Sequence, residues 1–243
     1  MKVLVGIPTL NEYGNIQKLV ASILNNLSFH VDILVVDDGS SDGTAEYLVK
    51  EAEFGKIYFV QRLRQLGVGS AHKCIIEFAN KHNYSFLATL DADGTHSIND
   101  LDRVIRELVN SQEDLIIGSR FIDGGNLRNW PIHRRIATNA AHVLTKMAIA
   151  QPFDCTSGLR AYRISPTLLN EVEKTEYEDY RFFYKSVFNF LRVGVRISQI
   201  PVTLESRHLG SSKMNPRKTY SLAKSLFIDS CLYSFSSRFL SHK

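Results

Sequence analysis

The sequence predicts one large α/β domain whose central sheet is mostly parallel and is covered by helices on both faces. Two observations predict this fold class. Short apolar runs alternate with longer amphipathic stretches, which is the pattern of right-handed βαβ units. The apolar runs also lack the strict alternation of a strand that has one face in water. With 243 residues, of which 44% are hydrophobic, the chain can bury one core of this kind.

Five short apolar runs are expected to form the core strands, and four amphipathic stretches the helices between them. The strands are expected at residues 3–7, 31–36, 57–60, 86–90 and 115–117. The helices are expected near residues 14–25, 43–53, 69–82 and 98–110. In the last of these, apolar residues from Ile98 to Leu108 recur on one face, which is typical of a helix that packs on a sheet.

Beyond residue 120 the expected elements are less regular. Gly124 and Gly125 predict a flexible loop over residues 121–130, which is a candidate lid. The remaining elements are expected to be a helix over 132–149, a short strand near 159–162, a helix near 180–193 and a strand near 196–204.

Charge is divided unevenly along the chain. Residues 1–119 contain 10 Lys and Arg against 16 Asp and Glu, whereas residues 120–243 contain 19 against 9. The acidic first part suits a bound divalent cation, and the basic second part suits a phosphate group, a membrane surface or nucleic acid. An ordinary solvated basic surface is the alternative for the second part.

The cysteines and the N-terminus predict a protein of a reducing compartment. Cys74, Cys155 and Cys231 are odd in number and form no Cys-x-x-Cys pair, which favours buried thiols over a disulfide framework or a zinc ribbon. The apolar run at residues 3–7 is too short for a signal peptide, and no apolar stretch reaches the roughly 18 residues of a spanning helix. We therefore expect a cytoplasmic protein, at most associated with the cytoplasmic face of a membrane.

Acidic residues follow two of the predicted strands, at the end of the sheet where ligands bind in parallel α/β folds. Asp91-Ala92-Asp93 follows the fourth strand, and two carboxylates at that turn can approach one Mg²⁺ or Mn²⁺ ion. Such an ion completes its shell with water and substrate phosphates. Asp37-Asp38 follows the second strand, where a carboxylate can bind a nucleobase or ribose, with Glu12 as a second ribose contact. For Asp91-Ala92-Asp93, an ordinary turn with Asp at two polar positions is the alternative.

Seven short motifs, two of which contain these acidic pairs, occur in order along the chain. They are Ile7-Pro8-Thr9-Leu10-Asn11-Glu12, residues 35–44, Gly67-Val68-Gly69-Ser70-Ala71, Asp91-Ala92-Asp93, Gly118-Ser119-Arg120, Thr156-Ser157-Gly158-Leu159-Arg160 and Arg207-His208-Leu209-Gly210-Ser211-Ser212-Lys213. Together they resemble the family 2 inverting glycosyltransferases, which have the GT-A fold with a Rossmann-like sheet. The resemblance covers about residues 3 to 213 and is closest to the polyprenyl-phosphate (dolichyl-phosphate) mannose synthases.

The resemblance implies a role for each matching residue. The nucleoside site would be lined by Pro8, Leu10, Glu12, Val36 and Asp38. Asp91, Ala92 and Asp93 would contact the diphosphate, and both aspartates would hold the metal. Phosphate groups of donor or acceptor would be bound by Arg120, Arg207 and Lys213, because Arg makes forked contacts to phosphate oxygens and Lys supplies a mobile charge. The catalytic residues would be Asp91, Asp93 and Arg120. Arg134 and Arg135 are either further acceptor contacts or a solvated helix face.

The implied reaction moves a hexose, such as mannose or glucose, from a GDP- or UDP-sugar to a polyprenyl phosphate with inversion. A phosphate monoester, with a second pKa of about 6, is largely dianionic at neutral pH and needs no general base. A sugar hydroxyl of a glycan or polysaccharide is the alternative acceptor. It would need a carboxylate base, for which Asp154 and the pair Glu178-Asp179 are candidates, although that pair could simply begin a helix.

The chain departs from the synthase pattern at four positions. Phe183 and Lys185 stand where the synthases usually have Gln and Glu, and Gly94 stands where they have Leu. Thr95 stands where a third metal ligand often lies. These departures concern the acceptor and the completion of the metal shell.

The C-terminal tail is expected to be an amphipathic helix. We expect residues 1–213 to form the catalytic domain and residues 214–243 the tail. Within the tail, Ile228, Leu232, Phe235 and Phe239 recur at helical spacing, with basic residues nearby. The helix would lie at a membrane interface, or else pack on the domain or on a second subunit.

Other α/β proteins fit the sequence less well. A nicotinamide-dependent dehydrogenase would carry Gly-x-Gly-x-x-Gly after the first strand, and a sugar-phosphate nucleotidyltransferase a Gly-rich basic loop; residues 8–12 contain neither. A nucleic-acid module is disfavoured, because acids at the strand ends repel phosphates unless a cation is bound. The expected partners are therefore a nucleotide sugar, a lipid phosphate or glycan, and a membrane surface, without nucleic acid.

Overall fold

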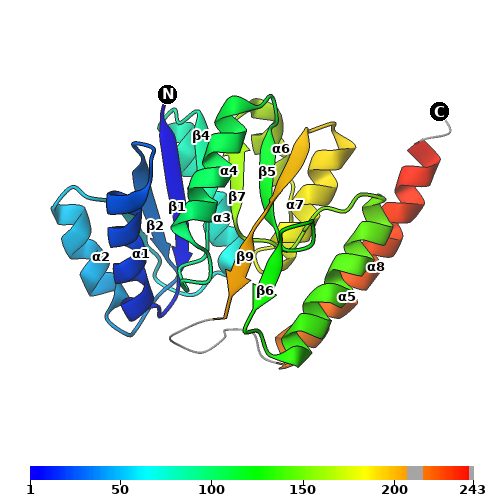
Figure 1. The fold of residues 1–243 in the computed structure, drawn as a ribbon, viewed down its shortest axis with the longest axis horizontal. Coiled ribbons are helices and arrows are strands. Elements are labelled where there is room, and N and C mark those ends of the chain that lie inside the picture. Colours follow the sequence, from blue (N-terminus) through cyan, green and yellow to red (C-terminus); the bar gives the residue numbers. More distant parts are fainter. Residues whose placement is uncertain (207–215, 241–243) are drawn as a thin grey trace.

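The computed structural model of the protein describes residues 1–206 and 216–240, and its centre is a seven-stranded sheet (Figure 1). The strand order is β3-β2-β1-β4-β7-β5-β8, and every neighbouring pair is parallel except those that β7 makes with β4 and β5. The strands are β1 (Val3–Thr9), β2 (Asp32–Asp37), β3 (Tyr58–Gln61), β4 (Phe86–Thr89), β5 (Leu115–Ser119), β7 (Arg160–Arg163) and β8 (Ile197–Pro201). The predicted mostly parallel sheet is confirmed.

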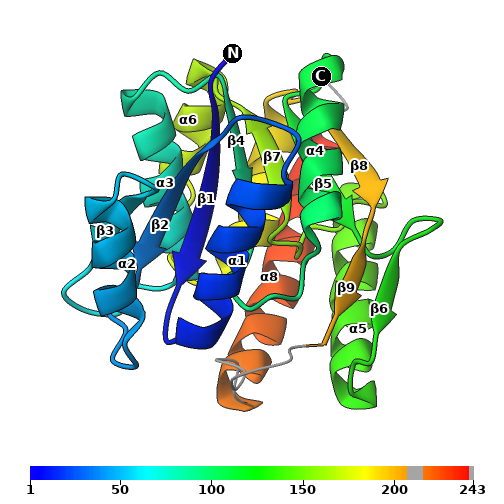
Figure 2. The same cartoon turned by 60° about the vertical axis from the view of Figure 1, so that its left-hand side comes forward.

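Helices cover both faces of this sheet, as the unbroken apolar runs predict. The side chains of Val3, Val5 and Ile7 join a core formed with α1, α2 and α4, whereas Leu4 joins the core on the opposite face with α3, α6 and α7. Figure 2 shows α1 and α4 in front of the strands. The helices are α1 (Tyr13–Asn26), α2 (Thr44–Glu53), α3 (Val68–Lys81), α4 (Ile98–Asn110), α6 (Pro166–Glu173) and α7 (Arg181–Arg192).

A second, two-stranded parallel sheet lies beside the main one, and the sequence did not predict it. It consists of β6 (Asn126–Arg128), within the stretch expected to be a flexible loop, and β9 (Thr203–Glu205). The single strand expected at 196–204 is divided, because Val202 donates to the Ser119 carbonyl and accepts from the Asn126 amide between β8 and β9. The chain therefore passes from the large sheet to the small one within one residue.

Two long helices, α5 (Ile132–Ile149) and α8 (Pro216–Leu240), pack side by side at one end of the molecule (Figure 1). The Asp229 carboxylate attaches α8 to α7, because it accepts from Tyr184 Oη at 2.8 Å and from Lys185 Nζ at 3.0 Å. Packing on the domain, one of the alternatives expected for the tail, is therefore present. The predicted boundary at residues 213 and 214 lies outside the described residues.

Three further expectations concern the chain as a whole. Among the described residues, no helix combines the length and the apolar character needed to cross a bilayer. All three cysteines are free thiols. Cys155 is buried as expected, but Cys231 is exposed, because it lies on the outer side of α8.

Candidate active site

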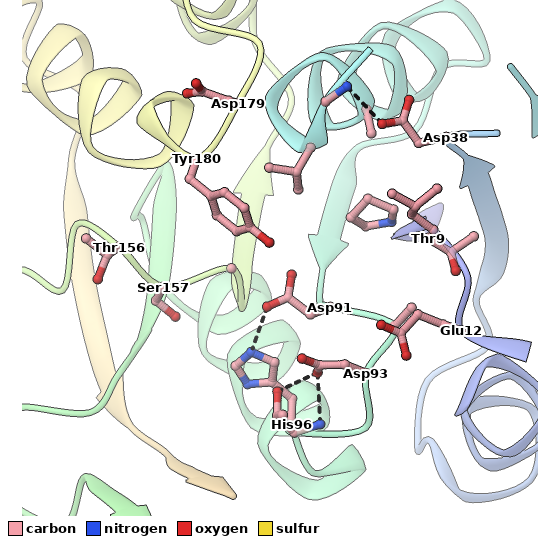
Figure 3. Close-up of a pocket in the computed structure, with 18 of the residues that line it drawn as sticks. Thr9, Glu12, Asp38, Asp91, Asp93, His96, Thr156, Ser157, Asp179 and Tyr180 are labelled. Atoms are coloured by element: carbon pink, nitrogen blue, oxygen red, sulfur yellow. Dashed lines mark hydrogen bonds and ion pairs between the residues drawn. The ribbon is translucent and has the colours of Figure 1, made fainter. Parts of the chain in front are cut away.

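A cavity of about 360 Å³ opens at the carboxyl ends of β1, β2 and β4, where the topology predicts a ligand site. The predicted residues that line it are Pro8, Leu10, Glu12, Asp38, Asp91, Ala92, Asp93 and Arg120. Figure 3 shows Asp91 and Asp93 projecting into it, with Glu12 on one side and Tyr180 on the other. Its volume is in the range of small-molecule and cofactor pockets.

The loop after β4 places the two aspartates of the triplet. Gly94 turns the chain with a φ of +72°, a conformation that favours glycine. Asp93 Oδ1 then accepts from the amide of Thr95 at 3.1 Å and from its hydroxyl at 2.7 Å, which fixes the carboxylate. Asp91 is the more accessible of the two, and its Oδ2 lies 3.8 Å from Nε2 of the buried His96. Thr95 thus positions Asp93, a role that its sequence position alone did not indicate.

The residues of this loop fit a hard divalent cation. The carboxylates of Asp91 and Asp93 both line the cavity, and carboxylate oxygens are the ligands that Mg²⁺ and Mn²⁺ prefer. In the described part of the chain, no three His, Cys, Asp or Glu side chains gather in a way that could hold a metal alone. A cation at the two aspartates would therefore complete its shell with water and substrate oxygens.

The opposite wall of the cavity approaches Asp91 closely. A Cβ atom at Gly158 would lie 3.0 Å from both Asp91 carboxylate oxygens, so a larger residue at this position would press on them and the Asp91 side chain would have to shift. Ser157 Oγ and Thr9 Oγ1 are buried hydroxyl oxygens that line the cavity and have no hydrogen-bond partner in the part of the chain that the structure describes. Buried polar atoms are nearly always satisfied, so both hydroxyls are candidate ligand contacts. The sequence motifs contained them without indicating this role.

Asp37 and Asp38 differ from the expected nucleoside contacts. Asp37 is fully buried, and its carboxylate accepts from the amide and hydroxyl of Ser40, closing the turn after β2. Asp38 lines the cavity, but its carboxylate accepts from the amides of Leu66 at 2.9 Å and Gly67 at 2.8 Å. It also pairs with Arg62 Nη1 at 3.0 Å. The carboxylates of Asp37 and Asp38 therefore hold the loops around the cavity in place.

Arg120 also has a different environment from the one expected. Its guanidinium is buried, donates from Nε and Nη2 to Asp154 at 2.7 and 2.6 Å, and reaches Thr156 Oγ1 at 2.6 Å. Burial by itself would raise the pKa of the Asp154 carboxyl, but the charge and hydrogen bonds of Arg120 outweigh it and hold that pKa below its ordinary value. Arg120 thus reaches the cavity wall as half of a buried ion pair.

The other predicted phosphate and nucleoside contacts fall into three groups. Val36 is fully buried in the apolar core and is not among the residues that line the cavity, because its side chain points to the α3 face of the sheet. Arg134, at the start of α5, does line the cavity and lies over the Trp130 ring at 4.9 Å, whereas Arg135 is exposed. Arg207 and Lys213 lie outside the described residues.

A segment before α7 completes the cavity and was not assigned a binding role from the sequence. Asp179, Tyr180 and Arg181 all line it. Their position depends on the glycine motif at the start of α3: Cβ atoms at Gly67 and Gly69 would lie 2.5 and 2.7 Å from backbone oxygens of residues 178 and 179. Asp179 also accepts from the Arg181 amide at 2.9 Å, so its carboxylate stabilises the turn that leads into α7, which is close to the alternative interpretation that the pair begins the helix.

Comparisons with known proteins agree with this geometry. The model of the family described as glycosyl transferase family 2 matches residues 4–188. A polyprenol monophosphomannose synthase of Mycolicibacterium smegmatis is 33% identical over 218 residues, which cover 88% of this chain and 81% of the relative. An undecaprenyl-phosphate mannosyltransferase of Micrococcus luteus is 33% identical over 217 residues, with 88% of each chain covered.

Solved structures establish the fold. Glucosyl-3-phosphoglycerate synthase of Mycobacterium tuberculosis, in complex with Mn²⁺, UDP and its product, superposes with a TM-score of 0.65 at 18% identity. The alignment covers 96% of this chain and 79% of that one. The same enzyme has been solved with Mg²⁺ and UDP, with a TM-score of 0.67. The predicted GT-A fold is thereby confirmed.

Proposed function

This chain belongs to glycosyl transferase family 2, and we propose that it transfers a mannosyl group from a nucleotide-diphosphate sugar to a polyprenyl phosphate with inversion. The names of the two relatives at 33% identity support both the sugar and the lipid acceptor. The nucleobase, guanine or uracil, is left to experiment. We further propose that the reaction uses Mg²⁺ or Mn²⁺ at Asp91 and Asp93, and that it takes place at the cytoplasmic face of a membrane.

The observation that carries the choice of acceptor concerns the three carboxylates considered as general bases: arginines occupy two of them, and the third does not line the cavity. Asp154 is buried against Arg120, as described above. Asp179 reaches the cavity but pairs with Arg181 Nη2 at 2.8 Å. Burial would raise the pKa of the Asp179 carboxyl, but the hydrogen bonds and charge of Arg181 lower it on balance, which weakens it as a base. Glu178 is exposed and does not line the cavity. A phosphate dianion needs no such base, whereas a sugar hydroxyl does.

The residues around the cavity divide the work between the two substrates. On the donor side, Pro8, Leu10 and Glu12 would enclose the nucleoside, and Asp91 and Asp93 would face its diphosphate. A bound cation would neutralise the diphosphate as it leaves. On the acceptor side, Arg134 would hold the lipid phosphate, with the Ser157 hydroxyl donating to one of its oxygens. In-line attack of a phosphate oxygen on the anomeric carbon then forms the new bond as the bond to the diphosphate breaks.

The proposal is tested with the purified chain, polyprenyl phosphate in detergent, and radiolabelled GDP-mannose, GDP-glucose and UDP-glucose. Label that enters the lipid extract and is released by mild acid supports a polyprenyl-phosphate sugar. Label that enters only added glycan would contradict the acceptor, and the best donor identifies sugar and base. Chelation is expected to abolish transfer and added Mn²⁺ to restore it. Transfer that is unaffected by chelation would contradict the metal.

A further inference from the structure

Among the side chains of α8 that the structure describes, at residues 220–234, one charged group is buried. The residues of this part that pack inward are Leu222, Leu226, Asp229, Ser230 and Tyr233, and their spacing places them on one side of the helix. Leu226 and Tyr233 join the apolar core, whereas Asp229 is a carboxylate that is only 6% exposed. Burying a carboxylate is costly unless it is paired and hydrogen-bonded, so the partners of Asp229 explain its position.

The partners of Asp229 come from α7 and from its own helix. Its Oδ1 accepts from Lys185 Nζ at 3.0 Å, and its Oδ2 accepts from Tyr184 Oη at 2.8 Å. Ser225 Oγ, about one turn earlier on α8, donates to the same Oδ2 at 3.3 Å. Removing one partner of a mostly buried ion pair is strongly destabilising, whereas an exposed pair contributes little. Asp229 therefore fixes the position of α8 on α7.

Lys185 is one of the four positions at which the chain departs from the synthase pattern. It is not among the residues that line the cavity, and its amine pairs with Asp229 instead. A Glu at this position would repel the Asp229 carboxylate, so the two residues form a complementary pair. The match to the family model ends at residue 188, so Asp229 and the rest of α8 lie beyond it. The departure at Lys185 thus concerns the attachment of α8.

The two helices that Asp229 joins both begin at the wall of the cavity. Tyr180, just before α7, lines the cavity, and so do Ser221 and Leu222 near the start of α8. Tyr184 follows Tyr180 by about one helical turn, and Asp229 follows Leu222 by about two turns. The contact between Asp229 and Tyr184 therefore sets how the two parts of the wall lie relative to each other.

This part of the wall belongs to the proposed acceptor side of the cavity. The helix α8 packs beside α5, and both helices begin at the same end of the molecule (Figures 1 and 2). Arg134, the proposed contact of the lipid phosphate, lines the cavity from the first turn of α5. Strand β1, which leads to the proposed nucleoside contacts, lies across the molecule from α8 (Figure 1). A displacement of α8 would therefore alter the acceptor side and spare the donor side.

We propose that Asp229 is a positioning residue for the acceptor: bound to Tyr184 and Lys185, it holds α8 so that Ser221 and Leu222 form part of the acceptor wall. The identity of the acceptor rests on the proposed function. Leu222 would supply an apolar contact to the polyprenyl chain while Arg134 holds its phosphate. When the pair is broken, α8 is correctly placed for only a fraction of the time, and the apparent affinity for the acceptor falls by that fraction.

The test breaks the pair and then restores it with the charges exchanged. Lys185→Glu places two carboxylates together, and the KM for polyprenyl phosphate should rise about tenfold while the KM for the nucleotide sugar stays within about twofold of wild type. Lys185→Glu/Asp229→Lys should recover most of the acceptor KM, because the pair can form again. Asp229→Asn is a second way to break the pair and should also raise the acceptor KM alone.

Hydrogen exchange followed by mass spectrometry reports the position of α8 without any reaction. Amides of residues 220–234 should exchange faster in Lys185→Glu and near the wild-type rate in the double variant. The matched control is Lys174→Glu on α6, which breaks the pair with Glu171, at 2.6 Å; neither residue lines the cavity. It should leave the exchange in α8 and both KM values unchanged. Circular dichroism checks that every variant is folded.

Three results would overturn the positioning role of Asp229. They are faster exchange in α8 with an unchanged acceptor KM, an equal rise in both KM values, and a double variant no better than Lys185→Glu. A wild-type chain that transfers no sugar to polyprenyl phosphate would contradict the proposed function instead. The exchange data, together with the KM for the acceptor that the wild type does use, would then decide the role of Asp229.

Discussion

The proposed donor side and the proposed acceptor side of the cavity are built in different ways. On the donor side, Asp37 is fixed by Ser40 and Asp93 by Thr95, both neighbours in sequence, whereas Asp38 is held by residues 24 to 29 positions away. On the acceptor side, the Arg120–Asp154 pair joins residues 34 positions apart. Short motifs therefore reveal the chemistry of the donor side, whereas the acceptor side depends on tertiary contacts that no short motif contains.

The largest effect is expected on the donor side, from Asp91→Asn and Asp93→Asn. Each change keeps the shape of the side chain but removes a negative charge from the cavity, where we propose that the diphosphate and its cation bind. Transfer of sugar to polyprenyl phosphate is expected to fall by about 10⁴-fold, measured as kcat/KM. The control is Asp123→Asn, in the exposed loop before β6. Variants of Asp91 and Asp93 that keep wild-type activity would show that the donor side is not organised around the triplet.

On the acceptor side, the largest effect is expected from breaking the buried ion pair. Arg120→Met leaves the Asp154 carboxylate buried and unpaired, and should lower the free energy of unfolding by about 3–5 kcal/mol. The double variant Arg120→Met/Asp154→Leu should recover most of this loss, because it buries no lone charge. The matched control is Arg181→Met, which breaks the exposed pair with Asp179 and should cost less than about 1 kcal/mol.

The activity of the double variant distinguishes a purely structural role of Arg120 from contact with substrate. If Arg120 acts only by holding Asp154, restored stability should bring restored transfer. If stability returns and transfer does not, Arg120 contacts a substrate phosphate, as the sequence predicted. Urea unfolding measures the first quantity and the lipid-transfer assay the second. An Arg120→Met variant as stable as wild type would contradict the structural role of the pair.

The sequence predicted the parts of the structure that depend on local signals and missed those that depend on distant contacts. The five core strands and four helices of the first part were predicted, because apolar runs and helical spacing are local signals. The β6–β9 sheet was missed, because each strand is only three residues long and its partner is distant. The burial of Arg120 was missed for a related reason, since its partner Asp154 lies in a loop after α5. Tyr180 was not assigned to the site, because glycines at the start of α3, distant in sequence, position its segment.

His72, which is buried on α3, should make the stability of the protein sensitive to acid. It is fully buried on α3, with ring contacts to Phe182 and Phe183, and neither ring nitrogen has a hydrogen-bond partner within the described residues. Burial lowers the pKa of His72 to about 4, although nearby Asp91 opposes the shift. The native state therefore keeps the ring neutral, whereas the unfolded chain takes up a proton near its ordinary pKa of 6.5.

Because the pKa of His72 is lower in the folded than in the unfolded chain, the stability of the protein should fall as the pH falls. The contribution of His72 is fully present above pH 6.5 and is lost as the pH falls towards about 4, to a total of about 3 kcal/mol. His72→Phe should therefore reduce the loss of stability between neutral pH and pH values near 5, measured by urea unfolding. Replacing the exposed His30 with Gln is the control and should leave the pH profile unchanged. An identical profile for His72→Phe would mean that the ring is not buried and neutral.

The smallest expected effect concerns Asp38, which connects the donor side to the acceptor side. Its carboxylate holds the amides of Leu66 and Gly67, and Gly67 abuts the backbone at residue 178. Asp38→Asn places an amide group against a backbone donor and should lower stability by about 2 kcal/mol. The KM for the nucleotide sugar should rise several-fold, because Gly67 and Val68 line the cavity.

A control at the other end of the same strand separates the two possible roles of Asp38. Asp32 begins β2 and accepts from Tyr84 Oη at 2.7 Å, far along the strand from the cavity, so Asp32→Asn should lower stability without changing KM. If Asp38→Asn raises KM and leaves stability intact, the carboxylate binds the nucleoside directly, as the motif implied. If KM rises and stability falls together, Asp38 acts by holding the cavity wall in place. Equal KM values for both variants and wild type would contradict both a binding role and a role in shaping the cavity, and would leave Asp38 only a role in stabilising the fold.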